Sequence, residues 1–256
     1  MGDVVGITVA VHSSKGGTGK TCISMNLAAL LSSDGYNVCL LDMDLKAPSL
    51  CTFFNKYPKW WLNEYLDGKC NINSVLHEIS PELGTNGKFA VGFSNPDITA
   101  IRMISNMERK WQAKALKLLL DAKKSLFQSG IDVLILDTGP GLEFESVNAI
   151  AIADIVLSVM IPGNISYKST EQLVNGVYRK LEKKYYLVEN MSHNPSVYLS
   201  GKKEVCGMSI LVSIPCMCDV PLKNDNLILS LTDPGHTFTT YVKRLSETIE
   251  EQLMST

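Results

Sequence analysis

The chain has 256 residues, of which 45% are hydrophobic and 20% are charged, and its formal net charge at pH 7 is −2. This composition excludes a disordered polyelectrolyte, and it lacks the overall basic excess that favours DNA or an anionic membrane. The length suits one α/β domain with a large core, so we expect residues 1–256 to form a single domain. Seven cysteines at scattered spacing and no apolar leader favour a reducing, cytoplasmic location, with peripheral contact to membrane or nucleoid left open.

A glycine-rich loop follows the first predicted strand, residues 6–11, and precedes a predicted helix with an apolar stripe. Glycine backbones bend tightly and turn their N–H groups towards an anion, and the helix N-terminus adds a positive dipole end. In this loop Lys20 would place a charge at the β- and γ-phosphates of a nucleotide, and the Thr21 hydroxyl suits Mg²⁺. The residues predicted to bind nucleotide here are Lys15, Gly16, Gly17, Thr18, Gly19, Lys20, Thr21 and Cys22.

Two aspartates, Asp42 and Asp44, stand at the end of the second predicted strand, residues 37–42. Side chains that alternate at a strand end point in different directions. One carboxylate can therefore support a hydrated Mg²⁺ while the other orients a water molecule at the γ-phosphate. Attack of water on a phosphoryl group depends mostly on such positioning and on charge stabilisation.

After a third predicted strand, residues 88–93, a fourth covers residues 132–137 and ends in Asp137. A buried apolar strand of this kind delivers one carboxylate to the outer shell of a metal ion at the carboxyl edge of the sheet. Gly139 and Gly141 follow at once and would allow the loop to move with a γ-phosphate. The two acidic strand ends and the phosphate loop thus predict one shared site.

The remaining apolar runs alternate with helical periodicity, which is typical of a parallel sheet covered on both faces. Further strands are predicted over 155–161, 185–189 and 209–214, and helices near 61–66, 72–79, 108–128, 169–184 and 238–253. A polar stretch, residues 191–207, is interpreted as a loop insertion. The predicted fold class is α/β, a doubly wound and mainly parallel sheet of seven strands.

The phosphate loop departs from the ordinary pattern, because Ser14 replaces its first glycine and Lys15 adds a second lysine. In this it resembles the deviant Walker A motif, KGGxGK[ST], of the ParA/MinD superfamily. The run from Asp137 to Gly141, DTGPG, is also similar to the DT/SxPG segment of that family. In its general sequence character the chain most resembles archaeal MinD-like ATPases. The resemblance, which covers nearly the whole chain, implies a P-loop NTPase fold and an ATP- and Mg²⁺-dependent homodimer. It further implies slow ATP hydrolysis and an unidentified partner or activator protein.

The same resemblance implies roles for individual residues. Lys15 would reach across the dimer to the partner's phosphates, and Asp44 would hold the attacking water. Asn190, after the sixth predicted strand, would read the adenine base, and Pro215, after the seventh, would border it. The residues implied for the Mg²⁺ shell are Thr21, Asp42 and Asp137.

A second function stays open at the cysteines late in the chain. Relatives in the Mrp/NUBP branch of the superfamily carry iron–sulfur clusters on a CxxC pair, whereas Cys216 and Cys218 here are separated by one residue, with Cys206 upstream. Such thiolates could hold a metal across a dimer axis, and small packing residues are the other interpretation. An iron–sulfur or metal carrier ATPase is therefore the alternative to a spatial organiser. A third class is a module that binds nucleotide without hydrolysing it. The presence of Asp42, Asp44 and Asp137 argues against this class.

Two features bear on contact with membranes or DNA. The tail, residues 238–253, has an apolar stripe but a polar face rich in glutamate, which favours a helix docked on the domain over one inserted among anionic lipids. A set of lysines could form a basic edge for DNA, or simply a solvated helix face: Lys180, Lys183, Lys184, Lys202 and Lys203. The sequence thus leaves membrane or DNA contact open but does not indicate it.

Overall fold

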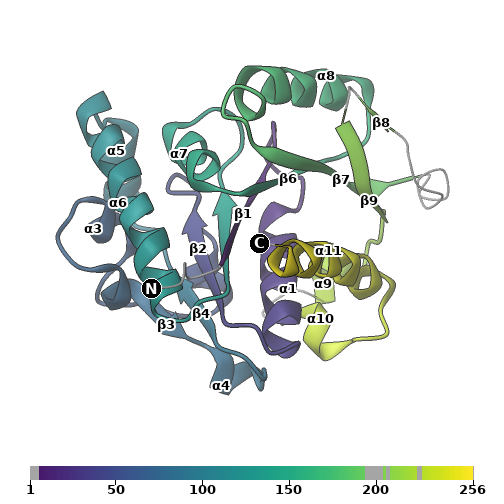
Figure 1. Cartoon of the computed structure of the whole chain (residues 1–256), viewed down its shortest axis with the longest axis horizontal. Coiled ribbons are helices and arrows are strands. Elements are labelled where there is room, and N and C mark those ends of the chain that lie inside the picture. Colours follow the sequence, from purple (N-terminus) through teal and green to yellow (C-terminus); the bar gives the residue numbers. More distant parts are fainter. Residues whose placement is uncertain (1–5, 194–203, 206–207, 224–226, 256) are drawn as a thin grey trace.

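The computed structural model describes residues 6–193, 204–205, 208–223 and 227–255. Within these ranges nine strands form one sheet, and helices cover both of its faces (Figure 1). The strands are β1 (Ile7–His12), β2 (Val38–Met43), β3 (Leu76–Glu78), β4 (Phe89–Gly92), β5 (Val133–Thr138), β6 (Ile155–Met160), β7 (Lys184–Ser192), β8 (Glu204–Val205) and β9 (Met208–Pro215). Their spatial order is β3-β4-β2-β5-β1-β6-β7-β9-β8. The end strands β3 and β8 are antiparallel to their neighbours, and the other pairs are parallel.

The helices differ widely in length. The longer ones are α1 (Lys20–Ser33), α5 (Ile98–Ser105), α6 (Arg109–Gln128), α7 (Phe144–Ile152), α8 (Asn164–Leu173) and α11 (Thr237–Met254). The short ones are α2 (Leu50–Phe53), α3 (Leu62–Leu66), α4 (Ser80–Leu83), α9 (Val220–Lys223) and α10 (Leu229–Thr232). A 3₁₀-helix, η1 (Ile72–Val75), and a π-helix, η2 (Val174–Tyr178), complete the set that the described residues contain.

Four central strands, β1, β2, β5 and β6, are buried along their whole length. A parallel sheet covered on both faces requires such continuous apolar runs. Residues of α1 and α11 join the core on one face, and residues of α6, α7 and α8 join the core on the other (Figure 1). The loops that follow β1, β2 and β5 therefore meet at one edge of the sheet, the carboxyl edge.

All seven predicted strands are present, which confirms the doubly wound, mainly parallel class, and β3 and β8 add two short edge strands to it. The predicted helix over 72–79 is wrong beyond its first turn. There η1 ends at Val75, and Leu76 pairs with Gly92 as β3 lines up antiparallel to β4. Pairing to a sheet edge outweighs the local helical preference of this short apolar run.

The predicted helix over 169–184 also needs correction. It begins earlier, at Asn164, and passes into the π-helix η2, where Tyr178 is fully buried. The chain turns at Glu182, which has a φ of +52°, and β7 begins at Lys184. The strand continues to Ser192, inside the predicted loop insertion, most of which lies outside the described residues.

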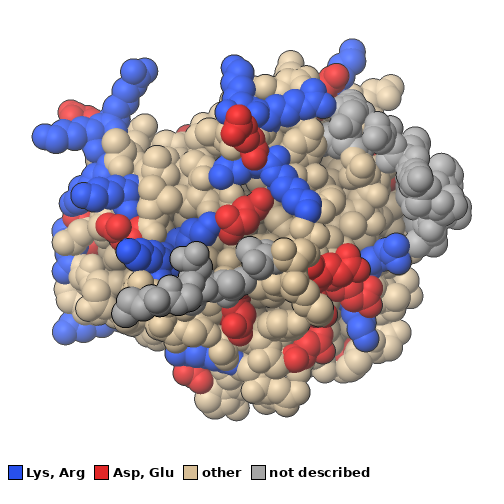
Figure 2. All heavy atoms as spheres, in the orientation of Figure 1, with Lys and Arg blue, Asp and Glu red and all other residues tan. Residues whose placement is uncertain are grey.

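The C-terminal helix α11 docks on the domain, as its pattern predicts. Phe238, Val242 and Leu245 are at most 1% exposed. Its outer face carries exposed Glu247 and Glu251, and Figure 2 shows acidic side chains gathered over this helix. Among the described residues, we find no helix with the length and apolarity needed to cross a bilayer.

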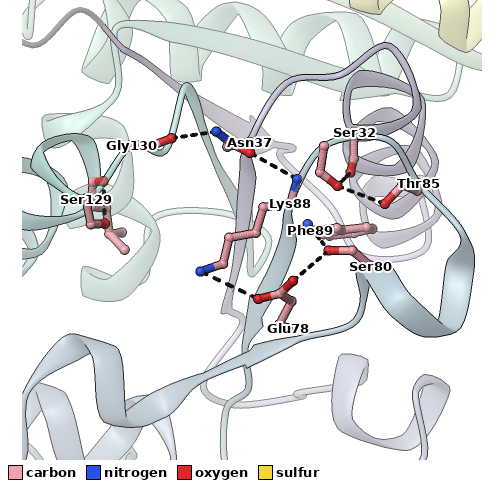
Figure 3. Close-up of polar contacts among 11 residues, drawn as sticks. Ser32, Asn37, Glu78, Ser80, Thr85, Lys88, Phe89, Ser129 and Gly130 are labelled. Atoms are coloured by element: carbon pink, nitrogen blue, oxygen red, sulfur yellow. Dashed lines mark hydrogen bonds and ion pairs between the residues drawn. The ribbon is translucent and has the colours of Figure 1, made fainter.

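Asn37, which precedes β2, joins the amino ends of three strands (Figure 3). Its Nδ2 donates to the Gly130 carbonyl at 2.9 Å, and its Oδ1 accepts from the Lys88 N–H at 3.0 Å. Its backbone carbonyl accepts from the Asp132 N–H at 2.8 Å, and its own N–H donates to the Asp132 carboxylate at 2.7 Å. These bonds fix the start of β2 against β4 and β5, at the edge opposite the phosphate loop.

We expect Asn37→Ala to lower the free energy of unfolding by about 1–2 kcal/mol, because two side-chain hydrogen bonds are lost at a half-buried position. Asn37→Asp should cost less, since its carboxylate still accepts from Lys88. Chemical denaturation measures both changes. Asn86→Ala, which removes one exposed hydrogen bond to Ser33, is the matched control. An Asn37→Ala variant as stable as that control would contradict the role.

Candidate functional site

The loop between β1 and α1 lies at the carboxyl edge of the sheet, where β1 is flanked by β5 on one side and β6 on the other. Crevices at such positions are the usual ligand sites of open α/β sheets. Gly17 and Gly19 have φ angles of +74° and +89°, a region that favours glycine. A Cβ at Gly19 would also lie 2.3 Å from Asn190 Nδ2, so no side chain fits there.

The two lysines of the loop lie in opposite environments. Lys20 is 7% exposed, and its Nζ donates to Ser13 Oγ at 3.0 Å. Burial lowers the pKa of Lys20, and the nearby Asp137 and Asp44 oppose that shift. Lys15, by contrast, is exposed. One lysine therefore points into the site, and the other faces solvent.

Two aspartates are buried side by side at the ends of β2 and β5. Asp42 and Asp137 are register partners in the parallel pair and are at most 1% exposed. Thr21 Oγ1 donates to Asp137 Oδ2 at 2.7 Å, and Ser24 Oγ donates to Oδ1 at 2.9 Å. Asp42 accepts the N–H groups of Asp44 and Leu50 at 3.2 and 3.3 Å.

Burial raises the pKa of Asp137 to about 6, against the lowering effect of the Thr21 and Ser24 hydroxyls. Burial also raises the pKa of Asp42, and the neighbouring Asp137 adds to the shift. Two buried carboxylates with raised pKa values are short of positive charge. Because hydroxyl and carboxylate oxygens are the donors that Mg²⁺ prefers, Thr21, Asp42 and Asp137 fit a magnesium ion.

Asp44 lies half-buried between two loops. Its Oδ1 accepts the Ala47 N–H at 3.0 Å, and a Cβ at Gly139 would lie 3.1 Å from the same oxygen. The loop after β5 therefore passes directly against this carboxylate. An ion pair between Lys46 and Glu143 joins the same two loops further out.

A cavity of about 280 Å³ lies on the other side of the phosphate loop. Asn190 donates from Nδ2 to the Thr18 carbonyl at 2.9 Å, and its Oδ1 accepts the Met191 N–H at 3.0 Å. Burial raises the pKa of Cys22 to about 12, so this thiol stays neutral. The predicted residues Cys22, Asn190 and Pro215 lie together on the wall of this cavity, with Gly17, Gly19, Ile214 and Phe238. The mostly apolar wall suits a flat base, and Asn190 keeps one N–H and one lone pair to read it.

Some residues of the site were missed by the sequence analysis. Ser24 lies one turn after Thr21 on α1, and that spacing could have identified it as a second donor to Asp137. Lys46 and Glu143 pair across the loops, although nothing in either segment predicts the partner. His12 is fully buried at the end of β1, directly before the phosphate loop, and no motif in the sequence marks it.

The cysteines do not gather into a metal site within the described part of the chain. No group of three or more His, Cys, Asp or Glu side chains that could hold a metal ion is found there. Cys216 and Cys218 are exposed, and Cys206 lies outside the described residues.

A family model described as an AAA domain matches residues 6–186, more than half of the chain. The antiactivator FleN of Pseudomonas aeruginosa is 28% identical over 188 residues, which cover 73% of this chain and 62% of FleN. An iron–sulfur cluster carrier protein of Aquifex aeolicus is 26% identical over 267 residues, which cover 96% of this chain and 68% of the carrier. The septum site-determining protein MinD of Pyrococcus horikoshii, solved in complex with Mg-ADP, has a TM-score of 0.78 at 19% identity, with 96% of each chain covered.

The matched segment thus spans less than two thirds of FleN, and the likeness to MinD concerns the fold. The family match covers the phosphate loop, both acidic strand ends and six of the nine strands that the described residues form. The chain therefore belongs to this AAA-domain family, and its relatives confirm the predicted membership of the ParA/MinD superfamily of P-loop ATPases.

Proposed function

We propose that this protein is a single-domain ATPase in which Mg²⁺ and ATP drive dimerisation, and slow hydrolysis reverses it, as a spatial organiser of the ParA/MinD kind. The observation that carries the proposal is the contact of 2.7 Å between Thr21 Oγ1 and the buried Asp137 carboxylate, with Asp42 beside it. Buried anionic oxygens next to a loop of phosphate-binding geometry suit a divalent cation and its nucleotide.

In this proposal Lys20 and the backbone N–H groups of residues 16–21 hold the nucleotide phosphates. Thr21, Asp42 and Asp137 hold Mg²⁺, which when bound neutralises charge that develops on the phosphate oxygens. Asp44 orients the attacking water, which its place against Gly139 supports. Cys22, Asn190 and Pro215 form the wall against which adenine lies.

The proposed dimer rests on Lys15. This lysine is exposed in the phosphate loop, whereas the Lys20 side chain is buried inside its own site. A second copy of the chain would receive the Lys15 ammonium at its own phosphates, so each site would be complete only in the dimer. Nucleotide hydrolysis would then separate the copies, and an unidentified partner or activator protein would set the timing.

We further propose a cytoplasmic location; the sequence neither indicates nor excludes peripheral contact with a membrane or DNA. The lysines that could form a basic edge are partly used within the fold, since Lys183 Nζ donates to the Ala151 and Ala153 carbonyls at 2.7 and 2.9 Å. Lys184 similarly contacts Gln252. Lys202 and Lys203 lie outside the described residues.

A metal or iron–sulfur carrier is the second candidate function. Two observations favour it: Cys216 and Cys218 are exposed near the proposed base pocket, and the relative from Aquifex aeolicus is named an iron–sulfur cluster carrier. Two thiols from each copy would supply four sulfur ligands across a dimer axis, the number that a cluster or a structural zinc ion takes.

Asp44→Ala should trap an ATP-bound dimer, because the water is no longer oriented while the phosphate contacts remain. We expect turnover to fall about a hundredfold or more. Light scattering with Mg-ATP should give the dimer mass for this variant and the monomer mass for Lys15→Ala. Asp121→Ala and Lys180→Ala, which remove exposed charges elsewhere, are the controls. Normal turnover in Asp44→Ala, or an ATP dimer of Lys15→Ala, would contradict the assigned roles.

Asp137 gives a pH-dependent prediction. Its pKa is about 6 in the fold and 3.8 in a free aspartate, so folding takes up a proton between these values. The stability of the metal-free protein therefore declines as pH rises through this window. Asp137→Asn should raise the free energy of unfolding at neutral pH by on the order of 1–3 kcal/mol, with no gain below about pH 4.

The same Asp137→Asn variant should lose the stabilisation that Mg-ATP gives the wild type. Thermal unfolding with and without Mg-ATP measures both effects, and Asp121→Asn is the exposed control. A variant that is less stable than wild type at neutral pH without metal would show that Asp137 is compensated by the fold alone.

Metal and sulfide analysis of protein purified without oxygen separates the two functions. For a spatial organiser we expect a colourless protein without bound metal. The metal and sulfide content of the Cys216→Ser/Cys218→Ser variant should then equal that of the wild type. A stoichiometric metal that this double variant loses would favour the carrier instead. Cys39→Ser is an unsuitable control because that thiol is buried, so Cys70→Ser serves as the control.

A further inference from the structure

His12 is the last residue of β1 and lies fully buried directly before the phosphate loop. Its two ring nitrogens contact different elements: Nε2 lies 2.8 Å from the Gly141 carbonyl, and Nδ1 lies 2.7 Å from the Tyr178 hydroxyl. A carbonyl oxygen can only accept, so Nε2 carries the hydrogen. In a neutral ring Nδ1 is then the acceptor, and Tyr178 donates to it.

The surroundings keep both partners in these states. Burial, opposed by the hydrogen bond to Gly141 and helped by the nearby Lys20 ammonium, lowers the pKa of His12 to about 4, so the ring is neutral at physiological pH. Burial raises the pKa of Tyr178, so the phenol keeps its proton. Ser158 Oγ lies 3.4 Å from the same phenol oxygen and completes the chain of contacts. The Gly141 carbonyl therefore requires the Nε2–H tautomer of His12, and the Tyr178 hydroxyl supports it as the donor to Nδ1.

Gly141 is held to the β1 end at two points. Its carbonyl accepts from His12, and its N–H donates to the Ser13 carbonyl at 2.8 Å. Its φ of +77° favours glycine and turns the loop towards α7. Because Gly139 of the same loop lies against Asp44, the position of Gly141 also governs how the loop approaches that carboxylate.

Tyr178 connects this pair to the helix beside the phosphate loop. It lies on the π-helix η2, which continues α8, and α8 contacts the phosphate loop where Ser14 Oγ donates to Ser169 Oγ at 3.2 Å. Single π-helical turns are rare and occur often at functional sites. The wider turn here carries a buried hydroxyl to a ring nitrogen of β1.

We propose that His12 is a positioning residue: the Gly141 carbonyl and the Tyr178 hydroxyl together hold its Nε2–H tautomer, and that hydrogen holds the loop of residues 137–141 against the phosphate loop in the geometry that hydrolysis needs. The inference rests on the proposed ATPase function. His12 touches no substrate and acts through Gly141. Its loss should therefore change the step that follows ATP binding and leave ADP binding intact.

The test compares Tyr178→Phe with Tyr185→Phe, which removes a neighbouring hydroxyl bonded to Arg179 instead. We expect Tyr178→Phe to lower kcat about tenfold, since a buried acceptor is left without its donor. ADP affinity should stay within about twofold in both variants. His12→Gln, whose amide can still donate to Gly141, should retain more activity than His12→Leu.

Two measurements do not depend on hydrolysis. Imidazole ¹⁵N shifts should report a protonated Nε2 and an unprotonated Nδ1 in the wild type, and Tyr178→Phe should change that pattern. Hydrogen exchange at the Gly141 amide should be about tenfold faster in Tyr178→Phe. A protonated Nδ1, or exchange and kcat as in Tyr185→Phe, would overturn the proposal. So would equal losses of kcat and ADP affinity, which indicate a merely structural role.

Failure of the two proposals can be told apart. A protein that hydrolyses no ATP but shows the expected tautomer and faster Gly141 exchange would contradict the ATPase function and keep the loop contact. A protein with normal turnover and a different tautomer would contradict the role of His12 alone.

Discussion

The site depends on two carboxylates buried next to each other at the carboxyl ends of parallel strands. Asp42 and Asp137 are register partners of β2 and β5, and burial raises the pKa of both. A pair of buried anions is costly unless a cation compensates it. Lys20 and the Thr21 hydroxyl compensate it only in part, so the carboxylates lower the stability of the fold, and the proposed Mg²⁺ ion would supply the missing positive charge.

Three loops surround these carboxylates, and a few side-chain contacts join them. Lys46 pairs with Glu143 across the loops after β2 and β5, and His12 bonds the second of these loops to the end of β1, directly before the phosphate loop. The sheet beneath is packed on both faces, so it cannot shift much. A ligand at the phosphate loop would therefore change the positions of the three loops before it changes the sheet. The exposed Lys15 lies in one of these loops.

The sequence predicted best what is contiguous in the chain. The phosphate loop and both acidic strand ends combine glycine spacing, apolar runs and charges within a few residues, and the fold brings them to one edge. The contacts that it could not predict join distant residues. His12 and Tyr178 are 166 positions apart, and nothing near Leu76 indicates that it will pair with Gly92. The π-helix, likewise, depends on packing that helical periodicity does not contain.

The most direct test of the account is the sedimentation of the unmodified protein with a slowly hydrolysed ATP analogue. With Mg²⁺ present, we predict a dimer with the ATP analogue and a monomer with ADP, and a monomer again when Mg²⁺ is removed. The same mass under all three conditions would contradict an ATP- and Mg²⁺-dependent switch.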